Sequence, residues 1–323
     1  MRILVAGGAG YIGSRLVPSL VDHGYEVDVI DALWFGNHLP PQVRVVKRDL
    51  FACGAAELEG YEQVIFLAGI SNDPMAEYDP AENFIQNGAL PAYLAFTAKK
   101  ARVRRFVYAS SCSIYGYTQD ELYDENGPIA CGYPYGISKL QGERAVLQMA
   151  DDEFSVIALR QGTVCGWSPR MRFDLIVNTM YKTARSSGVI TVNNASIWRP
   201  ILDIRDAVGA FTRAVQAGYS VSGVFNVASG NHTVGQVADL VKQGIEEKTS
   251  QRVRMEILSV KDFRNYKVDC GRARVELGFE PQYSIRDTVA DVHAHADDYG
   301  DFNRDEFYNI RVFKALAEKV QAR

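Results

Sequence analysis

The sequence predicts an α/β protein built on a doubly wound parallel sheet, with a smaller C-terminal lobe interleaved with it. Short apolar runs rich in Val and Ile alternate with helical stretches through the first half of the chain. A glycine-rich segment follows the first run directly and opens the first helical stretch. Parallel strands buried on both faces appear as continuous apolar runs, and helices between them form right-handed βαβ units.

Each candidate strand is short, apolar and rich in β-branched residues. The first, residues 3–6, begins almost at once, and a helical pattern at 14–23 follows it. The other candidates span residues 26–30, 43–46, 64–67, 106–109, 155–159 and 223–227. The last of these is expected to return to the same sheet. The tail from about Asp301 is expected to be helical.

The two halves of the chain differ in regularity. Residues 167–200 and 230–300 carry more Arg, Asn and turn residues. We therefore expect residues 1–166 to form a nucleotide-binding domain, with a later return near 200–228, and residues 167–323 to form mainly a substrate-binding lobe.

The charge balance excludes a general attraction for nucleic acid. The 323 residues include 35 Lys and Arg against 39 Asp and Glu, a formal net charge of −4, so any anionic ligand must be held by a local site. The most basic stretch, residues 99–105, falls between a predicted helix end and a predicted strand, where cations complement the helix dipole. We interpret it as a solvated turn and expect no nucleic-acid partner.

Cysteine usage and hydropathy favour a cytoplasmic protein. The five cysteines are scattered, odd in number and free of any CxxC pair, which is typical of reduced thiols. The first strand begins at once and leaves no room for a signal peptide, and no apolar run approaches the roughly 18 residues of a membrane-spanning helix. We therefore expect no membrane contact.

His293 and His295 stand two apart and point to different faces of a helix, so no metal site is expected.

The glycine-rich segment has the placement that a pyrophosphate site requires. It reads Gly7-Gly8-Ala9-Gly10-Tyr11-Ile12-Gly13 and lies between the first strand and the first helix. Glycine allows a tight turn and a close approach of phosphates, while free N–H groups at the helix start point at the anion. Asp31 ends the second strand 18 residues after Gly13. A carboxylate there accepts hydrogen bonds from ribose hydroxyls and repels a 2′-phosphate, which favours NAD over NADP.

Two further strand ends are candidates for the rest of the cofactor site. Asp49 and Leu50 follow the third strand, and Leu67, Ala68 and Gly69 follow the fourth. In a doubly wound sheet the carboxyl ends of the strands face the ligand crevice. Ordinary strand ends are an equally good interpretation of these five residues.

Tyr135 and Lys139 form a candidate catalytic pair. Pro134 opens a helix, and the i, i+4 spacing places the phenol and the ammonium on one face. A tyrosine with an ordinary pKa of about 10 is a poor base at neutral pH unless an adjacent cation stabilises the phenolate. Ser110 and Ser111 end the fifth strand, at the sheet edge that faces the same crevice.

Together these motifs resemble those of the extended short-chain dehydrogenase/reductases, in the NAD-dependent epimerase/dehydratase group that acts on nucleotide-linked sugars. The chain resembles this family in its GxxGxxG loop at 7–13, its SSxxxYG element at 110–116 and its YxxxK pair. The resemblance implies a Rossmann fold and NAD as cofactor. It implies that Ser111 hydrogen-bonds the reacting sugar hydroxyl, that Tyr135 is the acid/base, and that Lys139 binds the nicotinamide ribose and lowers the pKa of the tyrosine.

The resemblance also implies contacts beyond the catalytic residues. Asn87 resembles the family's helix asparagine near the active site, with a plain polar helix residue as the alternative, and Ser110 is expected beside the cofactor. The helices around 81–100 and 134–149 resemble those of the family's dimer interface, so a homodimer is expected.

The two residues after Ser111 bear on the reaction type. Dehydratases of the family place Asp and Glu there, and sugar-acid decarboxylases retain the Glu, because extra proton transfers need carboxyl groups. This chain has Cys112 and Ser113, which resembles the epimerases. We therefore expect 4-epimerisation of a nucleoside-diphosphate sugar through a transient 4-keto intermediate, with a 4-dehydrogenase or 4-ketoreductase as the alternative. A dehydratase and a noncatalytic NAD-sensing scaffold are less favoured.

Later motifs supply candidate substrate contacts. Thr163 stands where the family's LRxxNVYG segment has Asn, and residues 168–175 carry two arginines that suit a diphosphate, with solvent-facing charges as the alternative. Residues 198–206 resemble the family's RDxxHVxD segment, with Asp203 in place of its His. The candidate substrate-binding residues are Ser111, Cys112, Ser113, Tyr135, Thr163, Arg170, Arg172, Asp174, Leu175, Arg199 and Arg264.

Overall fold

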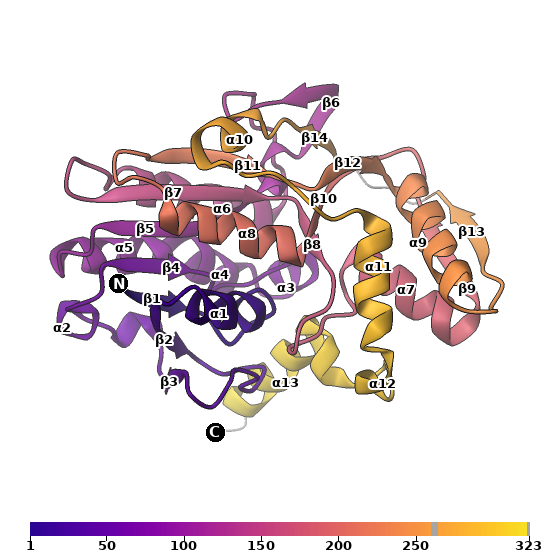
Figure 1. Ribbon diagram of the computed structural model, residues 1–323, viewed down its shortest axis with the longest axis horizontal. Coiled ribbons are helices and arrows are strands. Elements are labelled where there is room, and N and C mark those ends of the chain that lie inside the picture. Colours follow the sequence, from indigo (N-terminus) through magenta and orange to yellow (C-terminus); the bar gives the residue numbers. More distant parts are fainter. Residues whose placement is uncertain (260–263, 322–323) are drawn as a thin grey trace.

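A parallel sheet of seven strands forms the centre of the protein (Figure 1). The computed structural model describes residues 1–259 and 264–321. The strand order is β11-β7-β5-β4-β1-β2-β3, and every neighbouring pair is parallel. The strands span Arg2–Ala6 (β1), Glu26–Asp31 (β2), Arg44–Lys47 (β3), Gln63–Phe66 (β4), Arg105–Ser111 (β5), Ser155–Gln161 (β7) and Gly223–Val227 (β11). All seven predicted strands are confirmed, including the late return of β11, which pairs with β7.

Helices cover both faces of this sheet, as the doubly wound prediction requires. α1 (Gly13–Asp22) and α8 (Ile204–Gln216) lie on one face, while α5 (Leu90–Lys100) and α6 (Pro134–Leu147) lie on the other. Successive side chains of β1 alternate between the two core clusters that these helices close. Burial on both faces is the reason that the strands lack polar alternation.

Smaller elements build the connections and the C-terminal lobe. Three minor sheets have the strand orders β12-β10-β8, β13-β9 and β14-β6. The elements outside the main sheet and its four large helices span Ala55–Leu58 (α2), Asp73–Tyr78 (α3), Pro80–Phe84 (α4), Tyr117–Tyr123 (β6), Thr163–Cys165 (β8), Ile176–Ser187 (α7), Val189–Asn193 (β9), Trp198–Asp203 (β10), Gly230–Thr233 (β12), Val234–Lys248 (α9), Arg254–Leu258 (β13), Asn265–Val268 (β14), Gly271–Leu277 (α10), Ile285–Ala294 (α11), Ala296–Tyr299 (α12) and Asn309–Gln321 (α13).

The C-terminal helix begins later than predicted. α13 starts at Asn309 rather than near Asp301. The Asp301 carboxylate accepts the N–H of Asn303 at 2.9 Å, a local turn that competes with helix formation. A single 3₁₀ turn, Asp305–Phe307, then leads into α13.

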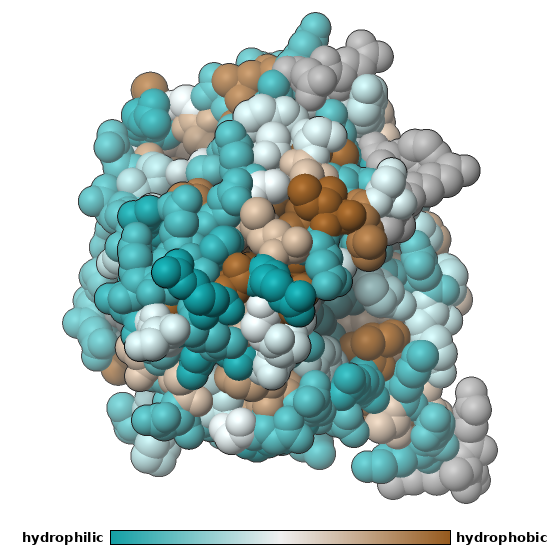
Figure 2. Space-filling view, turned by 90° about the vertical axis from the view of Figure 1, so that its right-hand side faces the viewer, coloured by the Kyte–Doolittle hydropathy of each residue, from teal (hydrophilic) through white to brown (hydrophobic). Residues whose placement is uncertain are grey.

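The outer face of the C-terminal lobe is largely polar. Figure 2 shows this face as mostly hydrophilic, with apolar groups in small separate patches. Ile257 and Leu258, both on β13, are among the exposed apolar side chains of the molecule. Within residues 1–259 and 264–321, no helix is both long and apolar enough to cross a bilayer.

The basic stretch 99–105 is not wholly a solvated turn, because Arg105 is fully buried. Its guanidinium donates to the carbonyls of Ala214, Ala217 and Gly218 at 2.9, 2.6 and 2.6 Å. These carbonyls lie at the C-terminal end of α8, where a helix leaves acceptors without intrahelical partners. The prediction was therefore wrong for Arg105, whose guanidinium caps the C-terminal end of α8.

Replacing Arg105 tests this cap. Arg105→Met should lower the free energy of unfolding by about 3 kcal/mol, because the α8 carbonyls lose their donors inside the protein. Urea denaturation followed by circular dichroism measures it. Arg104→Met, at the adjacent exposed position, is the matched control and should cost less than about 1 kcal/mol. Equal effects of the two substitutions would contradict the capping role.

Candidate active site

Two connected cavities lie at the carboxyl ends of the central strands. The inner cavity has Ser111, Tyr135 and Thr163 in its wall, and the outer cavity has Asp31 and Asp49. Both cavities are lined by the same five residues at their junction, namely Gly7, Gly10, Phe35, Leu67 and Gly69. The strand order reverses next to β1, which is where open α/β sheets bind ligands.

The three glycines of the GxxGxxG loop are required for two different reasons. Gly7 has a φ of +78°, and a Cβ there would lie 2.5 Å from the backbone N of Ala68. A Cβ at Gly13 would lie 2.2 Å from the carbonyl oxygen of Gly8. Gly10 is different, since the nearest atom to its Cβ would be the Gly7 oxygen at 3.4 Å. The protein itself leaves room beside Gly10, at the junction of the cavities, where a glycine would allow a ligand phosphate to approach the backbone closely.

Asp31 lies at the edge of the outer cavity with its carboxylate already oriented. One oxygen accepts the N–H of Ala9 at 3.0 Å, and the other accepts the N–H of Leu33 at 2.6 Å. Burial raises the pKa of Asp31, although these two backbone donors oppose the effect. Each carboxylate oxygen keeps a free lone pair, so the group suits a pair of ligand hydroxyls.

Five further residues predicted for the cofactor line the outer cavity. The wall of this cavity includes Asp49, Leu50, Leu67, Ala68 and Gly69. The Asp49 carboxylate also accepts the N–H of Phe51 at 2.9 Å, which fixes the turn after β3. The carboxyl ends of β3 and β4 thus meet at this site, as the parallel sheet dictates.

Tyr11 joins the glycine loop to the C-terminal lobe. Its hydroxyl donates to the carbonyl of Gly166 at 2.6 Å, and Asn178 donates to the same hydroxyl at 3.2 Å. Ser168 donates to the Tyr11 carbonyl at 2.7 Å. Tyr11, Ile12 and Gly13 all line the inner cavity. These bonds hold the start of α1 against the loop that carries the candidate arginines.

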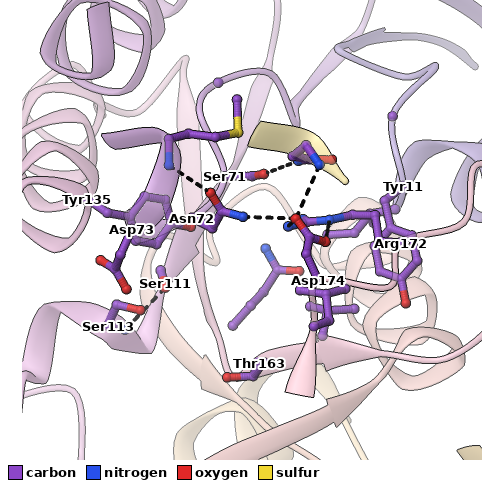
Figure 3. Close-up of a pocket in the computed structure, with 18 of the residues that line it drawn as sticks. Tyr11, Ser71, Asn72, Asp73, Ser111, Ser113, Tyr135, Thr163, Arg172 and Asp174 are labelled. Carbon is purple, nitrogen blue, oxygen red and sulfur yellow. Dashed lines mark hydrogen bonds and ion pairs between the residues drawn. The ribbon is translucent and has the colours of Figure 1, made fainter. Parts of the chain in front are cut away.

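Ser111 and Tyr135 face each other in the inner cavity (Figure 3). Burial raises the pKa of Tyr135 to about 12, while a hydrogen bond with the Ser111 side chain opposes the rise and the nearby Asp73 carboxylate adds to it. Lys139 is buried and lines neither cavity, and its Nζ lies 4.4 Å from the Tyr108 ring centroid. Burial lowers the pKa of Lys139 to about 7, although Glu143 opposes the shift.

Glu143 was not predicted from the sequence, yet it organises this region. It lies one helical turn after Lys139, and its carboxylate accepts the Ser110 hydroxyl at 2.6 Å. Arg160 donates to both oxygens of the same carboxylate, at 2.6 and 2.9 Å. Ser110 lines the inner cavity, but its hydroxyl is engaged by Glu143. Glu143 stands four residues after Lys139 on the same helix, and this i, i+4 spacing was the signal in the sequence that could have identified it.

Three predicted contacts, Asn87, Cys112 and Lys139, line neither cavity. Asn87 is buried and does not line either cavity. Its amide donates to the Ile70 carbonyl at 2.8 Å and accepts the Ile70 N–H at 3.0 Å. A Cβ at Gly69 would lie 2.2 Å from its Oδ1, so Asn87 shapes the loop after β4 from behind. Cys112 is also turned away, since its thiol donates to the Arg160 carbonyl at 3.1 Å within an apolar cluster.

Most of the candidate substrate residues line the inner cavity. Arg172 is buried and pairs with Asp174 at 2.8 Å, and Asp174 also accepts the Asn72 side chain at 3.0 Å (Figure 3). Arg264 pairs with Asp73. The predicted substrate residues that line this cavity are Ser111, Ser113, Tyr135, Thr163, Arg170, Arg172, Asp174, Leu175, Arg199 and Arg264.

The loop after β4 and the start of α13 were missed by the sequence analysis. Ser71, Asn72 and Asp73 line the inner cavity, and so does Asn309. The side-chain oxygen of Asn72 accepts the N–H of Met75 at 3.1 Å and so caps the start of α3. The Ser-Asn-Asp-Pro run at a predicted strand end was a usable signal for this loop.

Across the described ranges, no three His, Cys, Asp or Glu side chains gather as a metal would require.

Comparison with known proteins agrees with this geometry. A family model described as the NAD dependent epimerase/dehydratase family matches residues 3–228. The chain belongs to this family. UDP-glucose 4-epimerase of Bacillus subtilis is 26% identical over 326 aligned residues, which cover 90% of this chain and 95% of that enzyme. UDP-glucuronic acid decarboxylase 1 of Arabidopsis thaliana is also 26% identical, over 89% of this chain and 68% of that enzyme.

A solved structure of MoeE5 in complex with UDP-glucuronic acid and NAD is similar over nearly the whole chain. The TM-score is 0.81 at 26% identity, and the match covers 92% of this chain and 99% of MoeE5. This member of the epimerase/dehydratase family is therefore an NAD-dependent enzyme with a Rossmann fold. The open space beside Gly10 and the prepared carboxylate of Asp31 fit that cofactor.

Two glycine substitutions separate the cofactor site from the fold. Gly10→Ala should leave the melting temperature of the NAD-free protein nearly unchanged while it weakens NAD binding at least about tenfold, because only the ligand meets the new methyl group. Gly13→Ala should destabilise the protein by about 2 kcal/mol, because its methyl group meets the Gly8 carbonyl. Calorimetric titration with NAD and thermal unfolding measure the two effects. Wild-type NAD affinity in Gly10→Ala would contradict the assignment.

Asp73→Asn tests the electrostatics around Tyr135. The Asp73 carboxylate favours the protonated phenol and so raises the pKa of Tyr135. Its removal should lower this pKa and move the rising limb of the pH–rate profile to lower pH. Glu77→Gln, at an exposed position of the same helix, is the control and should leave the profile in place. A shift to higher pH would count against the proposed influence of Asp73.

Proposed function

We propose that this enzyme epimerises a nucleoside-diphosphate sugar at C4 through a transient 4-keto intermediate. The observation that carries the proposal is the single cavity in which Ser111 and Tyr135 face a wall of buried arginines. A serine and tyrosine pair suits proton removal from a sugar hydroxyl, while clustered guanidinium groups suit a diphosphate. The 4-epimerase from Bacillus subtilis, which aligns over most of the chain, supports this proposal.

The carboxylates of the cavity support epimerisation over reactions with further proton transfers. Among the described residues of the inner cavity, the acidic side chains are Asp73 and Asp174. Asp73 pairs with Arg264, and Asp174 pairs with Arg172. Cys112 and Ser113 supply no carboxyl group after Ser111. A 4-dehydrogenase or 4-ketoreductase remains the second candidate, because release of the keto sugar needs no additional acid.

Tyr135 acts as the base that takes the proton of the sugar hydroxyl, and Ser111 holds that hydroxyl in place. The phenol binds its proton tightly, since burial raises the pKa of Tyr135 to about 12. The Lys139 ammonium stabilises the phenolate, but burial brings the pKa of Lys139 down to about 7. Forming the phenolate therefore requires more positive charge in the site. NAD⁺, when bound, supplies this charge on its nicotinamide and accepts the hydride.

The substrate is held from the opposite wall of the cavity. We assign the diphosphate to Arg172, Arg199 and Arg264, which approach from three different segments of the chain. Thr163 and Ser113 offer hydroxyl groups to the sugar. Gln161 is 7% exposed, and its Oε1 has no hydrogen-bond partner among the described residues. A sugar hydroxyl is a suitable donor for this acceptor.

We propose a homodimer as well, formed through the helical segment 80–100 and α6. Ile85 and Phe96 on this segment are 43% and 49% exposed, and apolar side chains of this size favour burial in an interface. Sedimentation equilibrium measures the assembly, and a monomer at micromolar concentration would contradict it.

Tyr135→Phe is the decisive variant for the catalytic proposal. It should lower kcat by about two to four orders of magnitude, because the acid/base is lost, while NAD affinity stays within a factor of about three. Turnover is followed by NMR with a panel of UDP-, GDP-, CDP- and dTDP-sugars. Tyr117→Phe, at an exposed position, is the control. Wild-type turnover in Tyr135→Phe would rule out the assigned role.

The same assay separates the two candidate reactions. An epimerase converts the sugar to its C4 epimer with no accumulation of free NADH. A dehydrogenase releases the 4-keto sugar and produces NADH that absorbs at about 340 nm. Binding of no sugar nucleotide in the panel would reject the proposed substrate class.

A further inference from the structure

Arg170 is an enclosed cation with an unused donor. Its side chain is 3% exposed, and its Nε has no hydrogen-bond partner among the described residues. One terminal nitrogen donates to the side-chain oxygen of Asn309. Burial and the neighbouring Arg172 lower the pKa of Arg170 to about 9. A buried guanidinium with a vacant donor calls for an anionic partner.

The position of Arg170 indicates which anion this is. The guanidinium carbon lies 3.8 Å from the ring centroid of Phe35, and Phe35 is one of the residues shared by the two cavities. Asp31 is near enough to influence the charge of Arg170. A dinucleotide with one nucleoside in each cavity must pass its pyrophosphate through their junction. Arg170 therefore lies beside the junction through which the cofactor pyrophosphate would pass.

The start of α13 lies next to the junction of the two cavities, because Asn309 and Ile310 line the inner cavity. Asn309, which holds Arg170, also donates to the Ser71 hydroxyl at 2.6 Å. One turn later Phe313 packs against Trp34, with ring centroids 5.8 Å apart, and against Tyr78 at 6.1 Å. α13 thus joins the loop after β2 to the segment after β4, and Figure 1 shows it below these strands. All of α13 lies beyond the residues 3–228 that the family model matches.

We propose that Arg170 binds the pyrophosphate of NAD and that α13, through Asn309 and Phe313, clamps the cofactor in its cleft. The inference rests on the NAD dependence of the family and not on the reaction proposed above. It reassigns Arg170 from the substrate diphosphate, where the sequence placed it, because Phe35 lies at the junction of the two cavities and Asp31 lies in the outer one.

The dissociation rate of NAD tests the clamp without any sugar substrate. The purified holoenzyme is loaded with isotopically labelled NAD, freed of excess nucleotide and mixed with a large excess of unlabelled NAD. Mass spectrometry then follows the labelled NAD that remains bound. Arg170→Met should accelerate its loss at least about tenfold, because charge-assisted hydrogen bonds to the pyrophosphate disappear.

Variants of α13 test the clamp separately from the charge. Asn309→Ala and Phe313→Ala should each accelerate NAD loss about threefold or more, because the helix no longer holds Arg170 or the loop after β2. Glu318→Gln, exposed on the same helix, should keep the wild-type rate. Thermal unfolding of the NAD-free variants verifies that the fold is retained.

Two outcomes would overturn the inference. Unchanged NAD dissociation in a folded Arg170→Met protein, together with weaker binding of UDP, would return Arg170 to the substrate. Faster dissociation in Arg170→Met but not in either α13 variant would remove the clamp. If Arg170→Met does not fold, Arg170→Lys decides, because lysine keeps the charge but loses the planar stack on Phe35. Faster NAD loss in that variant supports the proposal, and the wild-type rate rejects it.

Discussion

The active site depends on the buried ion pair between Arg160 and Glu143. Arg160 extends from β7 and Glu143 from α6, and the guanidinium donates to both carboxylate oxygens. The same carboxylate receives the Ser110 hydroxyl from the end of β5. One network therefore sets the distance between the strand that carries Ser111 and the helix that carries Tyr135. Two buried charges are costly to desolvate, but this bidentate geometry offsets much of the cost, and loss of one partner typically costs about 3–5 kcal/mol.

The same principle of paired charges explains how an acidic protein receives anions. The net charge of −4 gives no general attraction, yet four arginines line one cavity. Arg172 and Arg264 are paired with Asp174 and Asp73, so they are held in position before any ligand arrives. Burial opposes the charge of Arg172, but the Asp174 carboxylate outweighs it and raises the pKa of Arg172. The local arrangement, rather than the overall charge, therefore decides what the site attracts.

Much of the fold was accessible from the sequence, because its signals are local. Seven apolar runs identified the central strands, and the glycine loop identified the start of α1, since each pattern reflects the geometry of a short segment. Arg105 was misassigned because its partners on α8 are more than a hundred positions away. Cys112 was misplaced for a related reason: its neighbours on the chain face the cavity, while packing turns its thiol to Arg160.

The sequence by itself indicated the parallel strands of a doubly wound sheet, the glycine loop with Asp31, a serine at the end of the fifth strand, and a tyrosine and a lysine four residues apart on one helix. These features are short motifs whose spacing already fixes their geometry. Only the tertiary structure placed Arg170 against Phe35, at the junction of the two cavities, and the start of α13 beside it. Arg170 meets Phe35 and Asn309 across 135 and 139 positions of sequence. Contacts of that range depend on how whole elements pack, which no local pattern records.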